Sequence, residues 1–174
     1  MKYLIASDLH GDVGGYTKLQ DLILKEHFDK LVLLGDLTNG YDVTPINNIL
    51  DNIYIPIQTV IGNCDNTRGI DQLHLGNLGY VHKEQLNNRS VVFSHGHRIN
   101  MNAGPEDMKK GDILLYGHFH FPEITIKKDV VCCCVGSISY PRGYSVATYA
   151  VLTETSISIY NINTQEPVIQ YNFD

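Results

Sequence analysis

In the first third of the chain, short apolar runs alternate with segments in which apolar residues recur every three or four positions. The apolar runs predict strands at residues 2–7, 30–34 and 56–61. The periodic segments predict two amphipathic helices between them, around residues 19–26 and 45–53. Strands and helices in strict alternation are typical of parallel β-α-β units, so we expect a parallel sheet covered by helices.

The rest of the chain has a different pattern, in which short β segments follow one another with turn residues between them. These strands are predicted at residues 90–94, 112–116, 123–126, 130–135, 145–153, 156–162 and 168–172. One short helix is predicted near residues 105–110. A β-rich half joined to a β-α-β-α half indicates an α/β fold with two sheets packed face to face and helices outside. No linker rich in glycine, serine or proline separates the halves, so residues 1–174 are expected to form a single domain.

Composition and charge narrow the class of protein. The 174 residues are 43% hydrophobic and 18% charged, a balance that supports a buried core. Thirteen basic and 19 acidic residues give a net charge of −6, and basic residues occur in pairs at most, so non-specific nucleic-acid binding and binding to anionic membranes are not expected. The longest apolar run, residues 130–135, is too short for a membrane span, and the N-terminus has no hydrophobic segment of signal-peptide length. A cytoplasmic protein is therefore expected.

Three of the four cysteines are adjacent, at Cys132, Cys133 and Cys134. Neighbouring residues on a strand point to opposite faces and cannot readily form a disulfide. No C-x-x-C pair occurs, so neither a disulfide framework nor a zinc ribbon is expected. The pattern favours a buried strand of small apolar thiols in a reducing compartment.

Side chains of the kinds that bind metals follow five of the predicted strands. In chain order they are Asp8 and His10, then Asp36, then Asn63 with Cys64 and Asp65, then His95 and His97, and finally His118 and His120. Because strand ends converge at one edge of an α/β sheet, these side chains are expected to lie together. On an extended backbone residues i and i+2 face the same side, so Asp8 with His10, or His118 with His120, could hold one ion.

The donor types indicate which ions would fit. Carboxylate, imidazole and carboxamide groups suit divalent Mn, Fe, Zn, Co or Ni, and seven candidate ligands suit two ions that share a bridge. Each motif alone has a common structural explanation, such as a helix cap, a turn or a packed histidine, so the ordered set carries the prediction. The glycines before Asp36, Asn63 and His118 are expected to relax the backbone limits where each strand turns sharply.

Taken together, these motifs resemble those of the calcineurin-like metallophosphoesterase superfamily. The motifs are Asp8-x-His10, Gly35-Asp36, Gly62-Asn63-x-Asp65, Ser94-His95-Gly96-His97 and Gly117-His118-x-His120. The chain length and residues 135–142 resemble its small bacterial and archaeal phosphodiesterase branch, the YfcE type. The resemblance implies a four-layer α/β/β/α sandwich with a dinuclear metal centre.

The resemblance also implies a role for each residue. One ion would be held by Asp8, His10, Asp36 and His120, and the other by Asp36, Asn63, His95 and His118. Asp36 would be the bridging carboxylate, Asn63 and His95 would also serve catalysis, and a hydroxide bridging two divalent ions, most simply Mn, would attack a phosphate ester. His97 and Arg142 are expected on the substrate side, where Arg142 could clamp a phosphate. A solvated surface arginine is the alternative for Arg142.

Cys64 departs from the family pattern, because many members have histidine there and that histidine is taken as the general acid. A thiol with a pKa near ~8.5 can donate a proton, so Cys64 either protonates the leaving group or simply fills the loop. Asp65 would orient the histidine in relatives, and here it could instead cap the following turn.

Charge counting leans toward phosphodiesters, and phosphomonoesters stay open because Arg142 or His97 could supply the missing positive charge. Two divalent ions with Asp8, Asp36 and hydroxide leave a charge of about +1, which a diester monoanion neutralises and a monoester dianion exceeds. A small phosphate ester is therefore the expected partner of the site.

Three other functions stay open on the sequence alone. The first is a non-catalytic protein-binding scaffold with this fold, like a retromer subunit; because all seven ligand positions are filled, an enzyme is favoured over it. A nuclease of the same superfamily is disfavoured by the acidic charge, and a single-metal hydrolase or oxygenase leaves Asn63 and the His118–His120 pair unexplained.

The β-rich half could also leave an edge strand that pairs with a second copy of the chain as a homodimer.

Overall fold

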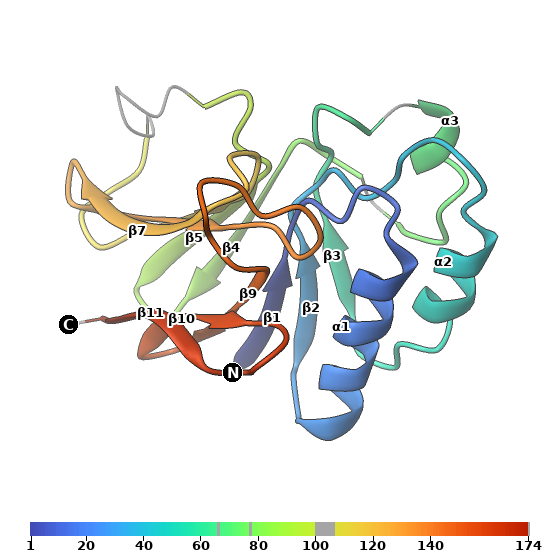
Figure 1. Cartoon of the computed structure of the whole chain (residues 1–174). Helices are drawn as coiled ribbons and strands as arrows, with labels where there is room; N and C mark the ends of the chain where they lie inside the picture. The colour runs from blue at the N-terminus through green and yellow to red at the C-terminus, as the bar shows by residue number, and fades with distance from the viewer. Residues whose placement is uncertain (66, 77, 100–106, 174) are drawn as a thin grey trace.

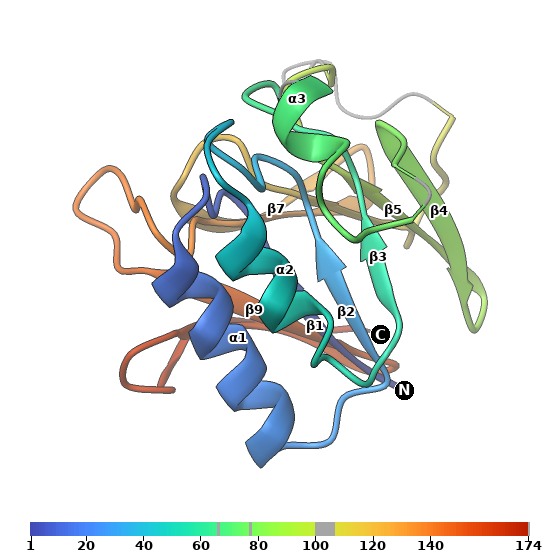
Figure 2. The same ribbon diagram turned by 90° about the vertical axis from the view of Figure 1, so that its right-hand side faces the viewer.

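The computed structural model describes residues 1–65, 67–76, 78–99 and 107–173. Two β-sheets lie face to face, and helices cover the outer side of one of them (Figures 1 and 2). The elements are β1 (Lys2–Ala6), α1 (Val13–Lys25), β2 (Lys30–Leu33), α2 (Thr44–Leu50), β3 (Ile57–Thr59), α3 (Thr67–Ile70), β4 (Val81–Leu86), β5 (Arg89–Ser94), β6 (Ile113–Tyr116), β7 (Pro122–Lys127), β8 (Val130–Val135), β9 (Thr148–Thr153), β10 (Ser156–Asn161) and β11 (Pro167–Asn172).

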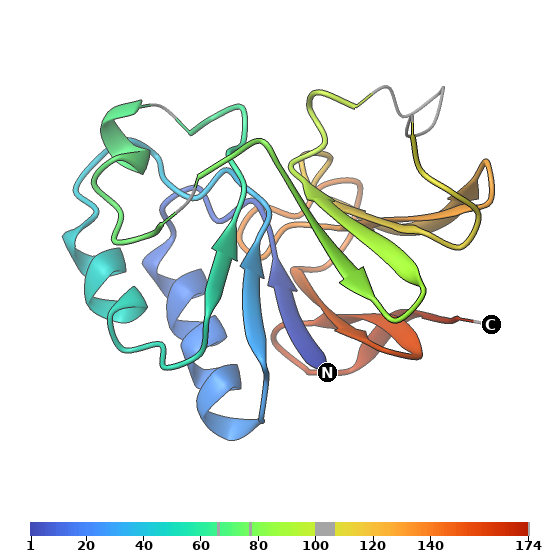
Figure 3. The ribbon, with the colours of Figure 1, turned by 180° about the vertical axis from the view of Figure 1, so that it is seen from behind.

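The first sheet has the strand order β11-β10-β9-β1-β2-β3. Strands β1, β2 and β3 are parallel, as predicted, and β9 extends the sheet by pairing antiparallel with β1. Helix α1 begins after Asp12, whose side chain accepts a hydrogen bond from the Gly14 N–H, and it buries Leu19, Leu22 and Ile23 as the periodicity predicted. Figure 3 shows the parallel strands pointing in one direction, so that their carboxyl ends reach the same edge.

The second sheet has the order β4-β5-β6-β8-β7, with β5, β6 and β8 parallel and the two edge strands antiparallel. Alternation of side chains gives each sheet two apolar faces. In β8, Cys133 packs in the core between the sheets, whereas Cys132 and Cys134 pack in a third core on the outer face. All three thiols are buried and free, which confirms the predicted strand of apolar cysteines.

The α/β sandwich is confirmed, with a core under the helices, a core between the sheets and a core on the far face of the second sheet. Ile99 and Met108 pack on that far face. Residues 100–106, which separate them and include the start of the helix predicted near 105–110, lie outside the described residues. The described part of that predicted helix, residues 107–110, is turn and loop instead, ending in a turn at Gly111.

Two elements were not predicted. Strand β4 is an edge strand whose side chains alternate between exposed and half-buried positions, and most of them are polar, so it lacks the apolar run that marks the buried strands. Helix α3 has four residues and too little periodicity to be detected. None of the helices in the described ranges is long and apolar enough to cross a membrane.

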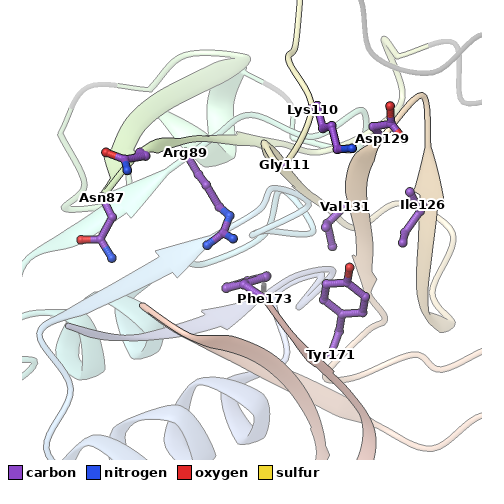
Figure 4. Close-up of a pocket in the computed structure, with 10 residues that line it drawn as sticks. Asn87, Arg89, Lys110, Gly111, Ile126, Asp129, Val131, Tyr171 and Phe173 are labelled. Carbon is purple, nitrogen blue, oxygen red and sulfur yellow. The ribbon is translucent and has the colours of Figure 1, made fainter.

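A cavity of about 620 Å³ lies at the opposite end of the second sheet from the carboxyl ends of its parallel strands (Figure 4). It is lined by the β4–β5 turn, by Lys110 and Gly111, by Asp129 in the β7–β8 turn and by aromatic residues of the C-terminal segment. The guanidinium of Arg89 lies 5.0 Å from the centre of the Phe173 ring in its wall. None of the candidate site residues lines this cavity.

Candidate metal centre

The loops that follow β1 and β2 are hydrogen-bonded to each other. The N–H of Asp8 donates to the Gly35 carbonyl at 3.1 Å, and the N–H of His10 donates to the Asp36 carbonyl at 2.7 Å. These bonds place two almost fully buried carboxylates, Asp8 and Asp36, beside a half-buried imidazole. Buried carboxylates of this kind require a compensating positive charge or several hydrogen-bond donors.

Five of the seven candidate ligands adopt a left-handed backbone conformation. The φ angles are 57° at Asp8, 47° at His10, 52° at Asp36, 68° at His118 and 63° at His120. The argument from an extended backbone was therefore wrong: tight turns, and not alternation along a strand, direct these side chains. They bring Asp8 and His10 together, but they direct His120 toward His10 and His118 toward His95. Left-handed residues other than glycine are uncommon, and such strain concentrates at functional sites.

The glycines in these loops also act differently from the prediction. Of the three glycines that precede Asp36, Asn63 and His118, only Gly35, at φ 91°, uses the left-handed region. At Gly62 a Cβ would overlap the backbone nitrogen and carboxylate of Asp36, and at Gly117 it would overlap the side chains of Ser7 and Asp8. Gly62 and Gly117 are thus required because two loops approach too closely for any side chain.

Asp8, His10, Asp36 and His120 form one compact group of donors, whose ligand atoms all lie within 4.8 Å of one another. His120 Nε2 is 3.1 Å from Asp8 Oδ1 and 3.4 Å from His10 Nε2. Asp8 Oδ1 is buried, and within the described part of the chain it accepts no hydrogen bond. An unpartnered buried carboxylate oxygen facing imidazole nitrogens fits a divalent cation.

His95, Asn63 and His118 form a second group of candidate ligands beside Asp36. His95 Nε2 is 3.4 Å from Asp36 Oδ2 and 3.0 Å from Asn63 Oδ1. The His118 ring packs against the His95 ring, with 5.2 Å between their centres. The same Asp36 oxygen is 3.6 Å from His10 Nε2, so one carboxylate oxygen faces both groups of candidate ligands.

Backbone carbonyls orient two of the imidazoles. Nδ1 of His95 is 2.8 Å from the Leu34 carbonyl, and Nδ1 of His120 is 2.7 Å from the Tyr140 carbonyl. A ring N–H that donates to such a carbonyl leaves Nε2 with its lone pair directed into the site, as metal-binding histidines require.

The carboxylates and imidazoles of the site shift one another's pKa. Burial opposes ionisation of Asp36, but its hydrogen bond to His95, the charge of His95 and the N–H of Cys64 outweigh burial and lower the pKa of Asp36. Burial likewise opposes protonation of His95, but Asp36 raises the pKa of His95. The nearby Asp8 carboxylate raises the pKa of His120 against its burial. A cation bound here would take the place of these imidazole protons.

Asp65 joins the loops that follow β2 and β3, and its carboxylate does not face the candidate metal ligands. Its carboxylate accepts the N–H groups of Asp36 at 2.8 Å, Leu37 at 2.7 Å, Thr38 at 3.3 Å and Gly62 at 2.8 Å. Asp65 therefore holds the backbone that carries Asp36. All four N–H groups belong to residues that precede Asp65, so these contacts differ from the predicted cap of the following turn.

Cys64 lies at the exposed side of the site, where its sulfur accepts a hydrogen bond of 3.2 Å from Asn63 Nδ2. Partial desolvation of the sulfur, together with the neighbouring Asp36 carboxylate, raises the pKa of the Cys64 thiol to about 11. Without a bound cation, the Cys64 thiol is thus protonated at neutral pH.

Two residues near the site were missed by the sequence analysis. Tyr140 lies edge-on to His10, with ring centres 5.5 Å apart, and lines a cavity of about 460 Å³ together with Arg142 and two of the imidazoles. Arg98 donates from Nε to His97 Nε2 at 3.2 Å. Neither follows a strand directly, and although Tyr140 lies in the segment 135–142 that resembles the phosphodiesterase branch, no role was predicted for it. Arg142, which was predicted, lies in the same cavity wall as Tyr140.

Comparison with known proteins identifies the family of this chain. A family model described as the calcineurin-like phosphoesterase superfamily domain matches residues 1–156. The chain belongs to the calcineurin-like phosphoesterase superfamily. Within it, the phosphodiesterase YfcE of Escherichia coli strain K12 is 28% identical over 184 residues, which cover 98% of this chain and 97% of the relative.

Solved structures agree with the superfamily assignment. The E. coli phosphoesterase YfcE superposes with a TM-score of 0.91 at 26% identity over the full length of both chains. Vps29 from Entamoeba histolytica, solved in complex with zinc, superposes with a TM-score of 0.67 at 17% identity over both full chains. The Vps29 likeness shows that the superfamily fold is shared and nothing further.

Proposed function

We propose that the protein is a metal-dependent phosphoesterase that hydrolyses phosphodiester bonds. The observation that carries the proposal is the position of Asp36, whose Oδ2 lies 3.6 Å from His10 Nε2 and 3.4 Å from His95 Nε2. The name of the full-length relative, a phosphodiesterase, supports the bond type.

The donor set is suited to two divalent cations. Asp8, His10, Asp36 and His120 would hold one, and Asp36, Asn63, His95 and His118 would hold the other. Manganese suits this mixture of carboxylate, imidazole and carboxamide, as do Zn, Fe, Co and Ni. When bound, the cations supply an activated water and neutralise charge on the phosphoryl oxygens.

The remaining residues bind the substrate or handle the leaving group. Arg142, in the wall of the cavity beside His10 and His120, binds a phosphoryl oxygen or the group attached to it. Cys64, protonated and exposed beside Asn63, supplies a proton to the departing oxygen. Two bound cations together with Asp8, Asp36 and hydroxide would carry a net charge of about +1, which favours a monoanionic diester over a dianionic monoester.

Turnover of bis-p-nitrophenyl phosphate with added Mn²⁺ tests the proposal. Asn63→Ala and His95→Ala each remove a donor of the second group beside Asp36, so each is expected to lower turnover about 100-fold or more. His27→Ala, at a highly exposed histidine outside the site, is the control and should keep wild-type turnover. Wild-type turnover in both site variants would show that the second ion site is wrong, and no turnover with any metal would favour the scaffold.

The role of Cys64 has a separate test. Cys64→Ala should slow esters with poor leaving groups, such as alkyl esters, by about tenfold or more and leave p-nitrophenyl esters nearly unchanged, because only the former need a proton. The measurement is the ratio of turnover on the two ester types. An unaltered ratio in both Cys64→Ala and Cys64→His would mean that Cys64 only fills the loop.

A further inference from the structure

The β4–β5 hairpin brings two more side chains to the rim of the site. Val81, the first residue of β4, pairs with Ser94, the last residue of β5, so Tyr80 and Arg98 leave the sheet at the same end. Gly79 also forms a bridge with Val60 and accepts the Ile61 N–H at 2.8 Å. Tyr80 is therefore anchored beside the segment that leads to Asn63.

Arg98 is held in place by two contacts, although it is exposed. Its guanidinium carbon lies 3.4 Å from the centre of the Tyr80 ring, and its Nε donates to His97 Nε2 at 3.2 Å. Within the described ranges, Arg98 forms no ion pair with a carboxylate. An arginine whose position is fixed by an aromatic face and an imidazole, and whose charge has no carboxylate partner among the described residues, is prepared to bind an anion.

His97 connects this arginine to the candidate metal ligands. The His97 ring is 5.4 Å from the His95 ring and 6.2 Å from the His118 ring, measured between centres. Arg98 thus lies one imidazole away from the donors on the His95 side. Arg142 instead lines the cavity that contains His10 and His120.

We propose that Arg98, stacked on Tyr80 and positioned by His97, binds a second anionic group of the substrate, a phosphate outside the bond that is hydrolysed. The inference rests on the proposed function and specifies its substrate class. Because Nε is engaged by His97, the four N–H bonds of the two terminal nitrogens remain, and they match two oxygens of a phosphate. His97 is accordingly a positioning residue for Arg98, and the expected substrate is a phosphodiester that carries a further phosphate.

Two matched substrates test this site in the Mn²⁺-loaded protein. They are thymidine 5′-(4-nitrophenyl phosphate) and the same ester with a 3′-phosphate. The wild type should have a KM about tenfold lower for the 3′-phosphorylated ester, and Arg98→Ala should abolish that preference with little change in kcat. Tyr80→Phe should keep the preference and Tyr80→Leu should weaken it, since the stacking face is lost.

The control is Arg89→Ala, which removes the same charge and a similar aromatic contact at the distant cavity of Figure 4. It should leave the preference intact. Equal KM values for the two esters in the wild type, or a preference that persists in Arg98→Ala, would overturn the proposal while leaving the phosphoesterase assignment standing.

Binding measurements, which need no turnover, distinguish failure of the anion site from failure of the proposed function. Calorimetry should show that thymidine 3′,5′-bisphosphate binds the wild type about tenfold more tightly than thymidine 5′-monophosphate, and that Arg98→Ala binds both equally. If no ester is hydrolysed with any metal, the proposed function fails and this comparison still decides the anion site. Equal affinities in the wild type would reject the site.

Discussion

At the scale of single residues, the site depends on backbone conformations that most side chains avoid. Asp8, His10 and Asp36 hold left-handed conformations because the β1 and β2 loops are hydrogen-bonded to each other and because Asp65 accepts four backbone N–H groups nearby. The surrounding bonds thus offset the local strain. The identity of these residues was predictable from the sequence, since each follows an apolar run, whereas their conformation depends on a neighbouring loop.

Gly62 lies where the loops that follow β2 and β3 approach each other too closely for a side chain, so its substitution tests that approach. Gly62→Ala places a methyl group against the Asp36 backbone and carboxylate, so we expect a loss of roughly 2–3 kcal/mol in the free energy of unfolding and weaker cation binding. Gly76→Ala is the matched control, because no atom lies within 4 Å of the position that its added methyl group would take, and it should change stability by about 0.5 kcal/mol or less. Urea denaturation measures both. Equal stabilities would show that the loops separate easily.

At the scale of elements, β4 does more than close an edge. Glu84 on β4 accepts hydrogen bonds from Lys30 on β2, from the Tyr3 hydroxyl at 3.0 Å and from His82 at 2.8 Å. It thereby joins the second sheet to the first. Burial opposes its ionisation, but the hydrogen bonds with Lys30 and His82 outweigh burial and lower the pKa of Glu84.

Glu84→Gln should therefore destabilise the protein in a pH-dependent way. A carboxylate whose pKa is lower in the folded state stabilises fully above its unfolded value of about 4.3, and the contribution is lost as the pH falls through the folded value. After allowance for solvent screening, we expect the variant to be about 1 kcal/mol less stable at pH 7, and we expect this difference to shrink as the pH falls below about 4.3. Denaturation across this range is the measurement, with the exposed Glu166→Gln as control; a difference that does not depend on pH would contradict the argument.

The contacts of Glu84 also show why β4 escaped prediction. Its side chains interact with the other sheet through polar groups, and polar strands give no apolar signal. The buried face of α1 and the buried strands were predictable, because their apolar residues recur at a regular spacing or form short runs along the sequence. The addition of β9, β10 and β11 to the first sheet was not, since pairing between distant segments leaves no local pattern.

At the scale of the whole molecule, the site draws on both sheets. Asp8, Asp36 and Asn63 follow strands of the first sheet, whereas His95 and His118 follow strands of the second. The predicted convergence of five strand ends is therefore realised across the sandwich. Without a cation, the two buried carboxylates repel each other and oppose this arrangement.

Metal loading should accordingly raise thermal stability. A cation present at a hundredfold excess over its dissociation constant adds about 2.7 kcal/mol, which corresponds to roughly 5–10 °C in Tm for a chain of this size. Excess EDTA should reverse the shift, as differential scanning calorimetry would show. Asp36→Asn should melt at one temperature with Mn²⁺ or EDTA, and identical melting of the wild type under both conditions would argue against coupled binding.

Because the donors belong to loops on both halves of the sandwich, a bound cation would be a cross-link between two layers that otherwise meet mainly through apolar packing. Neither half presents a complete coordination shell by itself. Capture of the ion would therefore be among the last events of folding, and any opening motion that parts the two layers would release it.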